Sequence, residues 1–284
     1  MSADIDFQAT NNLINQMDIP SAPAVLLELH EVMQKDTPEI NDIAEVIAKD
    51  VGLSALVLRT LNSPFFGMKV EVRSIKQATM LLGLANITNI VAGLALRRAM
   101  EESNDPSPPD FWDSPMNVAL VAAQLSKRFN IATSDEAYLM GLFLNCGEAL
   151  VLQKFPDSRD IKREAFDNGV IQVALEDERY RTNHAIIGYF ISKRWRLPEH
   201  ISCIILWHHD ATNFLDGQKK ENPQKKDLMA ICKLAEYIDA RFWGRQDDPE
   251  WNSCQDAVML ALGISDYELA EVLEEMHDIL INAD

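Results

Sequence analysis

The sequence contains little of what builds turn-rich, disulfide-bonded or membrane-embedded proteins. Only 11 glycines and 12 prolines occur among 284 residues, which disfavours a β architecture with many tight turns. The cysteines Cys146, Cys203, Cys232 and Cys254 form no CxxC pair, and the first three lie in apolar runs. We therefore expect buried free thiols in a reducing cytosol. No apolar run approaches the length of a transmembrane helix.

Basic residues are scarce relative to acidic ones. The chain has 26 lysines and arginines against 44 aspartates and glutamates, a formal net charge of -18. Electrostatic repulsion then disfavours binding to nucleic acid and to anionic membrane surfaces, so we expect neither as a partner. The first twelve residues are polar and acidic, unlike a secretory signal peptide. We expect a cytoplasmic protein.

The motifs of several common enzyme classes are missing as well. The sequence has no Gly-x-Ser-x-Gly elbow, no P-loop and no glycine cluster of the dinucleotide-binding kind. These absences remove the usual sequence signals for a serine hydrolase, a nucleoside triphosphatase and a nicotinamide-dependent enzyme. No cofactor is expected.

Helical periodicity dominates what is present. Apolar residues recur at offsets of three, four and seven in the segments 87–94, 118–125, 139–146 and 269–280, the spacing of one buried helix face. Alternation typical of a strand is limited to residues 68–72. Ser265 and Glu268 have the spacing of a capping box before the last segment. The pattern predicts an all-α fold.

Two polar segments interrupt the helical pattern. Residues 102–110 combine charge with three prolines, which makes them the best candidate for a domain boundary. Residues 212–226 are polar and contain Gly217 and Pro223, which predicts a surface loop. We predict a helical subdomain over residues 13–101, a larger core over 110–265 and a C-terminal helix over 266–284. That helix packs on its own core or on a second copy, so the oligomeric state stays open.

The N-terminal third carries a series of short motifs. They are Pro20-x-x-Pro23, Ile47-Ala48-Lys49-Asp50, Leu58-Arg59-x-Leu61-Asn62-Ser63 followed by Phe66-Gly67, and Ser74-Ile75-x-x-Ala78-x-x-x-Leu82-Gly83. In this order and spacing the chain resembles the HDOD family, a bacterial signalling module related to the HD-superfamily phosphohydrolases. The resemblance continues through Phe111-Trp112, Gly141 to Gly147, His184, Trp195, Leu197-Pro198 and His208-His209. It implies an HD-like helical bundle with a smaller N-terminal helical subdomain, and a role in signal transduction.

The resemblance also shows where the ligands of an HD-type metal site should stand. The family's His-Asp doublet lies in Gly-Leu-Leu-His-Asp-x-Gly, which matches Gly141-Leu142-Phe143-Leu144-Asn145-Cys146-Gly147. Leu144 cannot ligate a metal, and Asn145 offers only a neutral oxygen. Ser114 stands where the first histidine is expected, and Glu236 is the counterpart of the distal aspartate. The resemblance therefore implies a degenerate site without catalytic residues and without its primary metal.

Three histidines remain from this constellation, and two interpretations compete for them. In relatives with two metals the residues corresponding to His184, His208 and His209 serve the second metal, and with a nearby carboxylate such a trio could bind Zn²⁺. Alternatively they are structural, because His208 continues the apolar stripe of residues 201–205. We favour the structural interpretation, with the histidines beside a ligand-binding cleft. The expected cleft residues are Asn145, His184, His208, His209 and Glu236.

Three functions follow from these alternatives. The leading one is a non-catalytic signal-transduction protein that binds another signalling protein or a small ligand and passes on a conformational change. The second is a metal-dependent phosphohydrolase with a rearranged site built on the three histidines and Glu236. The third is a module that binds a cyclic dinucleotide without cleaving it, with Arg179, Arg181 and Lys193 as its basic residues.

Overall fold

The chain folds into helices joined by short connections. The computed structural model describes residues 14, 17, 19, 21–63, 66, 68, 70–102, 111–216 and 222–281. No strand occurs among these residues, so the predicted all-α class is confirmed. The elements are α2 (Ala24–Met33), α3 (Ile40–Ala48), α4 (Val51–Leu61), α5 (Ile75–Leu82), α6 (Leu84–Glu102), α7 (Asp113–Phe129), α8 (Ser134–Phe143), α9 (Gly147–Lys154), η2 (Pro156–Asp160), α10 (Ile161–Asp167), α11 (Gln172–Tyr180), α12 (His184–Arg194), α13 (Glu199–Trp207), η3 (His208–Asp210), α14 (Ala211–Leu215), α15 (Pro223–Phe242), α16 (Pro249–Leu262) and α17 (Asp266–Ile281).

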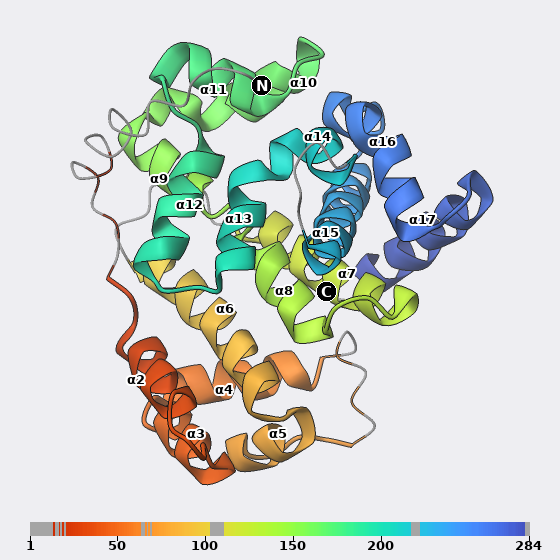
Figure 1. The fold of residues 1–284 in the computed structure, drawn as a ribbon. Coiled ribbons are helices and arrows are strands. Elements are labelled where there is room, and N and C mark those ends of the chain that lie inside the picture. The colour runs from red at the N-terminus through yellow and green to blue at the C-terminus, as the bar shows by residue number, and fades with distance from the viewer. Residues whose placement is uncertain are drawn as a thin grey trace.

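The helices α2 to α5 form a small bundle at one end of the molecule, and α6 runs from this bundle into the larger body (Figure 1). The helix α6 was predicted from the spacing of four apolar residues. All four are fully buried: Ile87, Ile90, Val91 and Leu94. Because α6 packs against α2, α4 and α5 and also against α8, its apolar face joins both parts in one continuous core. The small bundle is the N-terminal subdomain that the resemblance implied.

Two of the N-terminal motifs fix the connection between α4 and α5. Asn62 binds both backbone groups of Val72: its Nδ2 donates to the carbonyl at 2.8 Å, and its Oδ1 accepts from the N–H at 2.7 Å. Ser74 then caps α5 by accepting a hydrogen bond from the backbone N–H of Gln77 at 3.1 Å. The motif residues therefore hold the backbone where it turns between the two helices.

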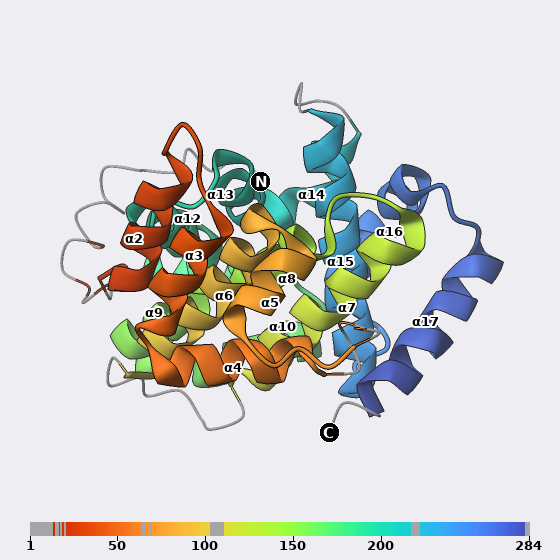
Figure 2. The same ribbon diagram turned by 90° about the horizontal axis from the view of Figure 1, so that it is seen from below.

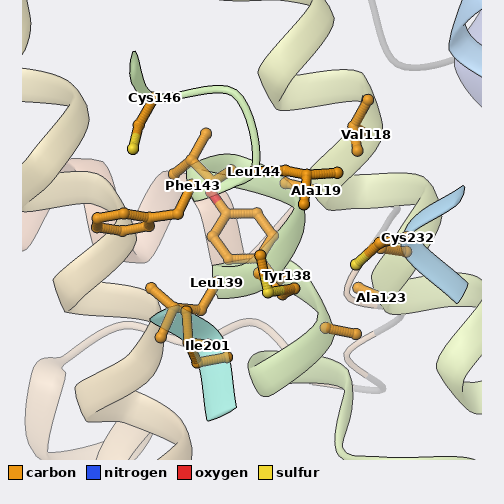
Figure 3. Close-up of a cluster of buried hydrophobic side chains, with 14 of the residues drawn as sticks. Val118, Ala119, Ala123, Tyr138, Leu139, Phe143, Leu144, Cys146, Ile201 and Cys232 are labelled. Carbon is orange, nitrogen blue, oxygen red and sulfur yellow. The ribbon is translucent and has the colours of Figure 1, made fainter. Parts of the chain in front are cut away.

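The larger body is organised around α7, α8 and α15, which pack against one another. Figure 3 shows buried side chains from this region, among them Val118, Ala119, Tyr138 and Leu144. The helices α7 and α8 cross closely because Gly141 has no side chain. A Cβ at Gly141 would lie 2.7 Å from the Cα of Ala119, well inside van der Waals contact. The glycine of the family motif therefore sets the separation of these two helices.

The last helix packs on its own chain. The stripe of α17 from Leu269 to Leu280 is buried, and α17 lies beside α15 (Figure 2). The predicted capping box is present: the Ser265 N–H donates to the Glu268 carboxylate at 2.8 Å, and the Glu268 N–H donates to the Ser265 hydroxyl at 3.4 Å. Of the two alternatives for this helix, the structure shows packing on its own core.

Other sequence-based boundaries differ from the structure or fall outside it. The loop predicted over residues 212–226 is wrong in part, because α14 extends to Leu215 and α15 begins at Pro223. Phe214 in this segment is fully buried. The boundary predicted within 102–110 falls on residues 103–110, which lie outside the described residues, so the division there stays a prediction. Within the described chain, none of the helices is long and apolar enough to cross a membrane.

Candidate functional site

A glycine contact brings the degenerate doublet against the first retained histidine. Gly147 begins α9, two residues after Asn145, and lies directly against the start of α12 at His184. A Cβ on Gly147 would lie 2.0 Å from the carbonyl oxygen of His184, so a larger residue would force the two helices apart. The closeness of this crossing therefore depends on the second glycine of the family motif.

Three histidine rings meet beside this crossing. One ring nitrogen of each of His184, His208 and His209 lies within 4.8 Å of the others. His184 and His209 share a hydrogen bond of 2.7 Å between their Nε2 atoms, and the rings of His208 and His209 are 3.9 Å apart between centroids. His184 begins α12, whereas His208 and His209 belong to the 3-10 turn η3. All three side chains are buried.

The outer nitrogen of each ring is held by an oxygen atom. His184 Nδ1 donates to Glu176 at 2.8 Å, and His209 Nδ1 donates to Glu250 at 2.8 Å. His208 Nδ1 donates to a backbone carbonyl of the preceding helical turn at 2.7 Å. These contacts fix the orientation of the rings, and contacts of the same kind accompany histidines that ligate metals.

The hydrogen bonds constrain the protonation of the rings. His209 Nδ1 donates to Glu250, and if His209 is neutral its Nε2 accepts from His184, which then donates from both of its nitrogens. Burial opposes a charge on His184, but the Glu176 carboxylate outweighs burial and raises the pKa of His184 above its ordinary value. Burial, together with the His184 cation, lowers the pKa of His209 well below its ordinary value. These shifts favour the charged form of His184 and the neutral form of His209.

A buried lysine organises the other half of the cluster. Lys233, in the middle of α15, is 3% exposed and donates to Glu236 at 2.7 Å and to Glu250. Asn145 Nδ2 donates to the second oxygen of Glu236 at 2.9 Å, and Asn145 Oδ1 lies 3.0 Å from Nε2 of His208. Burial by itself would lower the pKa of Lys233, but the two carboxylates outweigh it and raise this pKa well above its ordinary value. The cluster thus contains a permanent ammonium between two carboxylates.

The positions of the missing metal ligands are committed to other contacts. Ser114 donates to Asp239, and Asn117 donates to the other oxygen of the same carboxylate at 2.9 Å. Leu144 is fully buried in the apolar core (Figure 3). Since Asn145 is bound to Glu236 as well, these residues do not fit the primary metal site of an HD hydrolase.

The histidine trio fits a metal better than the doublet does. Three imidazole nitrogens, each ring with an outer oxygen contact, are the donor set of a transition ion such as Zn²⁺ with one open position. His184 would first have to lose the proton that Glu176 stabilises. The ion would also face the Lys233 ammonium, whose charge disfavours a second cation. The geometry of the three histidines therefore suits one bound ion, whereas the proton on His184 and the Lys233 ammonium disfavour its binding.

A cleft with two adjoining parts lies beside the cluster, and His184 and His208 line neither part. The inner part has a volume of about 70 Å³, and Asn145, His209 and Glu236 contribute to its wall. The outer part has a volume of about 280 Å³ and shares Asn145 with the inner part. His184 and His208 are linked to these wall residues by hydrogen bonds. All five residues predicted for the cleft thus come together, while ligand binding by them stays a prediction.

Sequence reasoning missed four charged residues of this region. They are Glu176, Lys233, Asp239 and Glu250. Lys233 had a detectable signal, since it stands alone in the apolar run 228–235, three residues before Glu236. Glu176 and Glu250 lie in segments with several neighbouring charges, and no local pattern distinguishes them from solvent-exposed residues.

Comparisons with known proteins found similarity in sequence and in fold. A protein of Treponema pallidum (strain Nichols) is 29% identical over 247 residues, which cover 76% of this chain and 46% of that protein, so the chain spans less than half of this relative. A candidate phosphohydrolase from Shewanella amazonensis SB2B matches with a TM-score of 0.71 at 24% identity over 98% of both chains. A candidate signal transduction protein from Marinobacter aquaeolei VT8 matches with a TM-score of 0.71 at 19% identity, over 99% of this chain and 66% of that one. At these identities the two structures establish a common fold.

The family assignment rests on a match to a family rather than to a single protein. The HDOD domain matches residues 19–211, a range that includes the N-terminal motifs, both motif glycines and all three histidines of the cluster. This range is more than half of the chain, and the chain therefore belongs to the HDOD domain family.

Proposed function

We propose that this HDOD protein is a regulatory protein that binds a small ligand or a signalling partner at its cleft and does not hydrolyse phosphoesters. The observation that carries the proposal is the buried ammonium of Lys233 between Glu236 and Glu250. Carboxylates in this position would otherwise attract a divalent cation, and here the chain supplies the positive charge itself. The Marinobacter neighbour, a candidate signal transduction protein, is in line with such a role.

The energetics of the buried pair support the same proposal. A metal that took Glu236 as a ligand would leave Lys233 in the interior with one carboxylate fewer. Breaking a buried ion pair at one partner typically costs about 3–5 kcal/mol, and the incoming ion would have to supply this. The hydrogen bond from Asn145 to Glu236 would be lost in addition. A neutral or anionic ligand in the cleft meets neither obstacle.

The proposal is tested by metal content and turnover measured together. Elemental analysis of the purified full chain should give substoichiometric divalent metal, and bis(4-nitrophenyl) phosphate should not be hydrolysed with Mn²⁺ or Zn²⁺ added. A matched variant, Asn145→Asp, restores one carboxylate at the doublet and controls for the assay's response to an added ligand. Tightly held stoichiometric metal together with turnover by the unmodified chain would overturn the proposal.

A second candidate function is a phosphohydrolase with a metal on the histidine trio. The observation that favours it is the convergence of three imidazole nitrogens within 4.8 Å. If it holds, His209→Ala removes both Zn²⁺ binding and turnover while the far-ultraviolet circular dichroism stays unchanged. If Zn²⁺ titration of the unmodified chain gives no saturable binding, this second function is excluded.

The cyclic-dinucleotide alternative has less support. Arg179 is paired with Glu164, and Lys193 is paired with Glu199. Neither basic residue lines the two parts of the cleft described above.

The proposed regulatory function also includes a location in the cytoplasm and a partner that is neither nucleic acid nor a membrane.

A further inference from the structure

We propose that the outer part of the cleft binds a small aromatic anion, a planar ring carrying one phosphate or carboxylate group and no larger than a mononucleotide. The inference rests on the proposed ligand-binding function and names the class of ligand. The outer part has a volume of about 280 Å³, close to the lower end of the roughly 300–1,000 Å³ of small-molecule sites. A ligand of one ring and one anionic group fits this volume, whereas two linked nucleotides exceed it.

An exposed indole forms one wall of the outer cleft. Trp243, directly after α15, is 51% exposed although it is a large apolar residue. Its Nε1–H donates to Asp239 at 3.0 Å, and the ring of Phe242 contacts it edge-on at 5.5 Å between centroids. The indole is thus held in one orientation before any ligand arrives. A fixed aromatic face at a cleft costs little entropy on binding and favours stacking with a planar ring.

The same carboxylate anchors the indole and the start of α7. Asp239 accepts hydrogen bonds from Trp243, Ser114 and Asn117. Phe111, just before α7, is half-buried and lines the outer cleft together with Trp243. Two aromatic side chains from distant parts of the sequence are therefore positioned around one cavity through a shared buried group. This arrangement suits a flat apolar ring better than a flexible chain.

Basic side chains gather at the same cavity in a chain whose net charge is -18. Arg159, Lys162 and Arg245 line it, each from a different segment. Of its two acidic lining residues, Glu176 is hydrogen-bonded to His184 and Glu148 lies 3.7 Å from Lys162. Three basic residues thus stand against two acidic ones in the lining, an excess of one basic residue. A small anion satisfies this excess, whereas the charge of the whole molecule repels an extended polyanion.

Arg245 has a donor that lacks a partner. Its Nε atom is buried and makes no hydrogen bond among the described residues. A buried donor without an acceptor is unfavourable, and an arginine presents its N–H groups in a fork that matches a phosphate or a carboxylate. A ligand anion with its ring on Trp243 would use the indole face, and it would satisfy this donor once the Arg245 side chain turns its buried Nε toward the cavity.

Calorimetry on the full chain tests the proposal with paired probes. Phenyl phosphate, benzoate and adenosine 5′-monophosphate are titrated, with phenol and inorganic phosphate as the separate halves of the ligand. At least one of the aromatic anions should bind saturably, and the halves should bind at least about tenfold more weakly. Comparison of phenyl phosphate with benzoate identifies which anionic group the cleft takes.

Variants place the binding on the proposed residues. Arg245→Gln and Trp243→Ala should each weaken the best probe by about tenfold, and Trp243→Phe should restore most of the affinity that Trp243→Ala loses. Arg73→Gln, at an exposed arginine of the small bundle that is paired with Glu71, is the matched control and should bind as the unmodified chain does. The inference is wrong if no aromatic anion binds at millimolar concentration. It is also wrong if neither Arg245→Gln nor Trp243→Ala changes the dissociation constant of the best probe.

Phosphate release measured on the same samples separates this inference from the proposed function. Binding of the probes without release of phosphate agrees with both the proposed ligand class and the proposed non-catalytic function. Binding with turnover that requires a metal would overturn the proposed function and leave the ligand class standing. If the probes neither bind nor are hydrolysed, the proposed ligand class is overturned and the non-catalytic assignment stands.

Discussion

At the scale of single residues, Lys233 has the largest effect on the charge balance of the cleft. Its ammonium faces Glu236 and Glu250 at 3% exposure, so the two carboxylates depend on one cation. We expect Lys233→Met to lower the free energy of unfolding by about 3–5 kcal/mol, because methionine keeps the length of the side chain and leaves two largely buried carboxylates, 18% and 17% exposed, without a cation. Urea denaturation measures this loss.

The double variant Lys233→Met/Glu236→Gln is the control for that prediction. It removes one of the two uncompensated carboxylates, so it should be more stable than Lys233→Met alone. A single variant as stable as the unmodified chain would show that solvent reaches the carboxylates and that the ammonium is not needed in the cleft.

Some residues of the site could be predicted from the sequence, whereas others could not. Asn145 and Leu144 were identified as a degenerate doublet from the surrounding glycines, and the structure shows Leu144 in the core and Asn145 bound to Glu236. Lys233 could have been found as the only charge in an apolar run. Glu176 could not, because its burial results from the start of α12 covering it, a contact that no local spacing encodes.

At the scale of helices, the crossing of α9 and α12 is the most constrained contact near the cleft. A Cβ at Gly147 would lie 2.0 Å from the backbone oxygen of His184, and backbone cannot rotate away as a side chain can. We expect Gly147→Ala to destabilise the chain by about 1–3 kcal/mol or more and to disturb the ring of His184. Thermal unfolding and the histidine resonances in an NMR spectrum report the two effects.

Gly52→Ala is the matched control for this crossing. Gly52 lies in the first turn of α4, and its added Cβ would meet the side chains of Arg98 and Asp50 at an ordinary 3.4 Å. Alanine favours helix by about 1 kcal/mol over glycine, so this variant should be neutral or slightly more stable. Equal losses in both variants would contradict the special role of the crossing.

The helices themselves followed from the sequence wherever one face is apolar. The segments 87–94 and 269–280 were predicted as helices because their period matches the buried face of α6 and α17. The segment 212–226 was predicted as a loop because its polar residues dominate the count. Phe214 nevertheless anchors α14 in the core, and a helix this short has too few residues to show a period.

At the scale of the whole molecule, the contact between Glu136 and His200 contributes to the response to acid. Glu136 on α8 accepts a hydrogen bond of 2.6 Å from His200 on α13, and this contact lowers the pKa of Glu136 below its ordinary value despite burial. The carboxylate is therefore more acidic in the folded chain than in the unfolded one. Its contribution to stability is complete above the unfolded pKa of about 4.3 and is lost as the pH falls through the folded pKa.

We expect Glu136→Gln to be less stable than the unmodified chain at pH 6 and to approach its stability at pH 3. Acid also changes the net charge of the chain, which is -18 at pH 7 and positive below the pI of about 4.7, but this effect is nearly the same in both proteins and cancels in the difference. Urea unfolding at several pH values gives that difference. If the difference in the free energy of unfolding between the two proteins does not change with pH, the glutamine is disfavoured for its shape rather than for its missing charge.

The ammonium of Lys233 has a consequence for how such a protein behaves in a cell. An ion bound from solution follows mass action, so its site empties when the supply falls and exchanges when a competing ion is abundant. The Lys233 cation is covalently part of the chain and is present once per molecule from synthesis onward. Under the proposed regulatory function, we expect the charge of this part of the cleft to stay the same during metal starvation, metal excess or chelation, so that ligand binding does not depend on the metal supply.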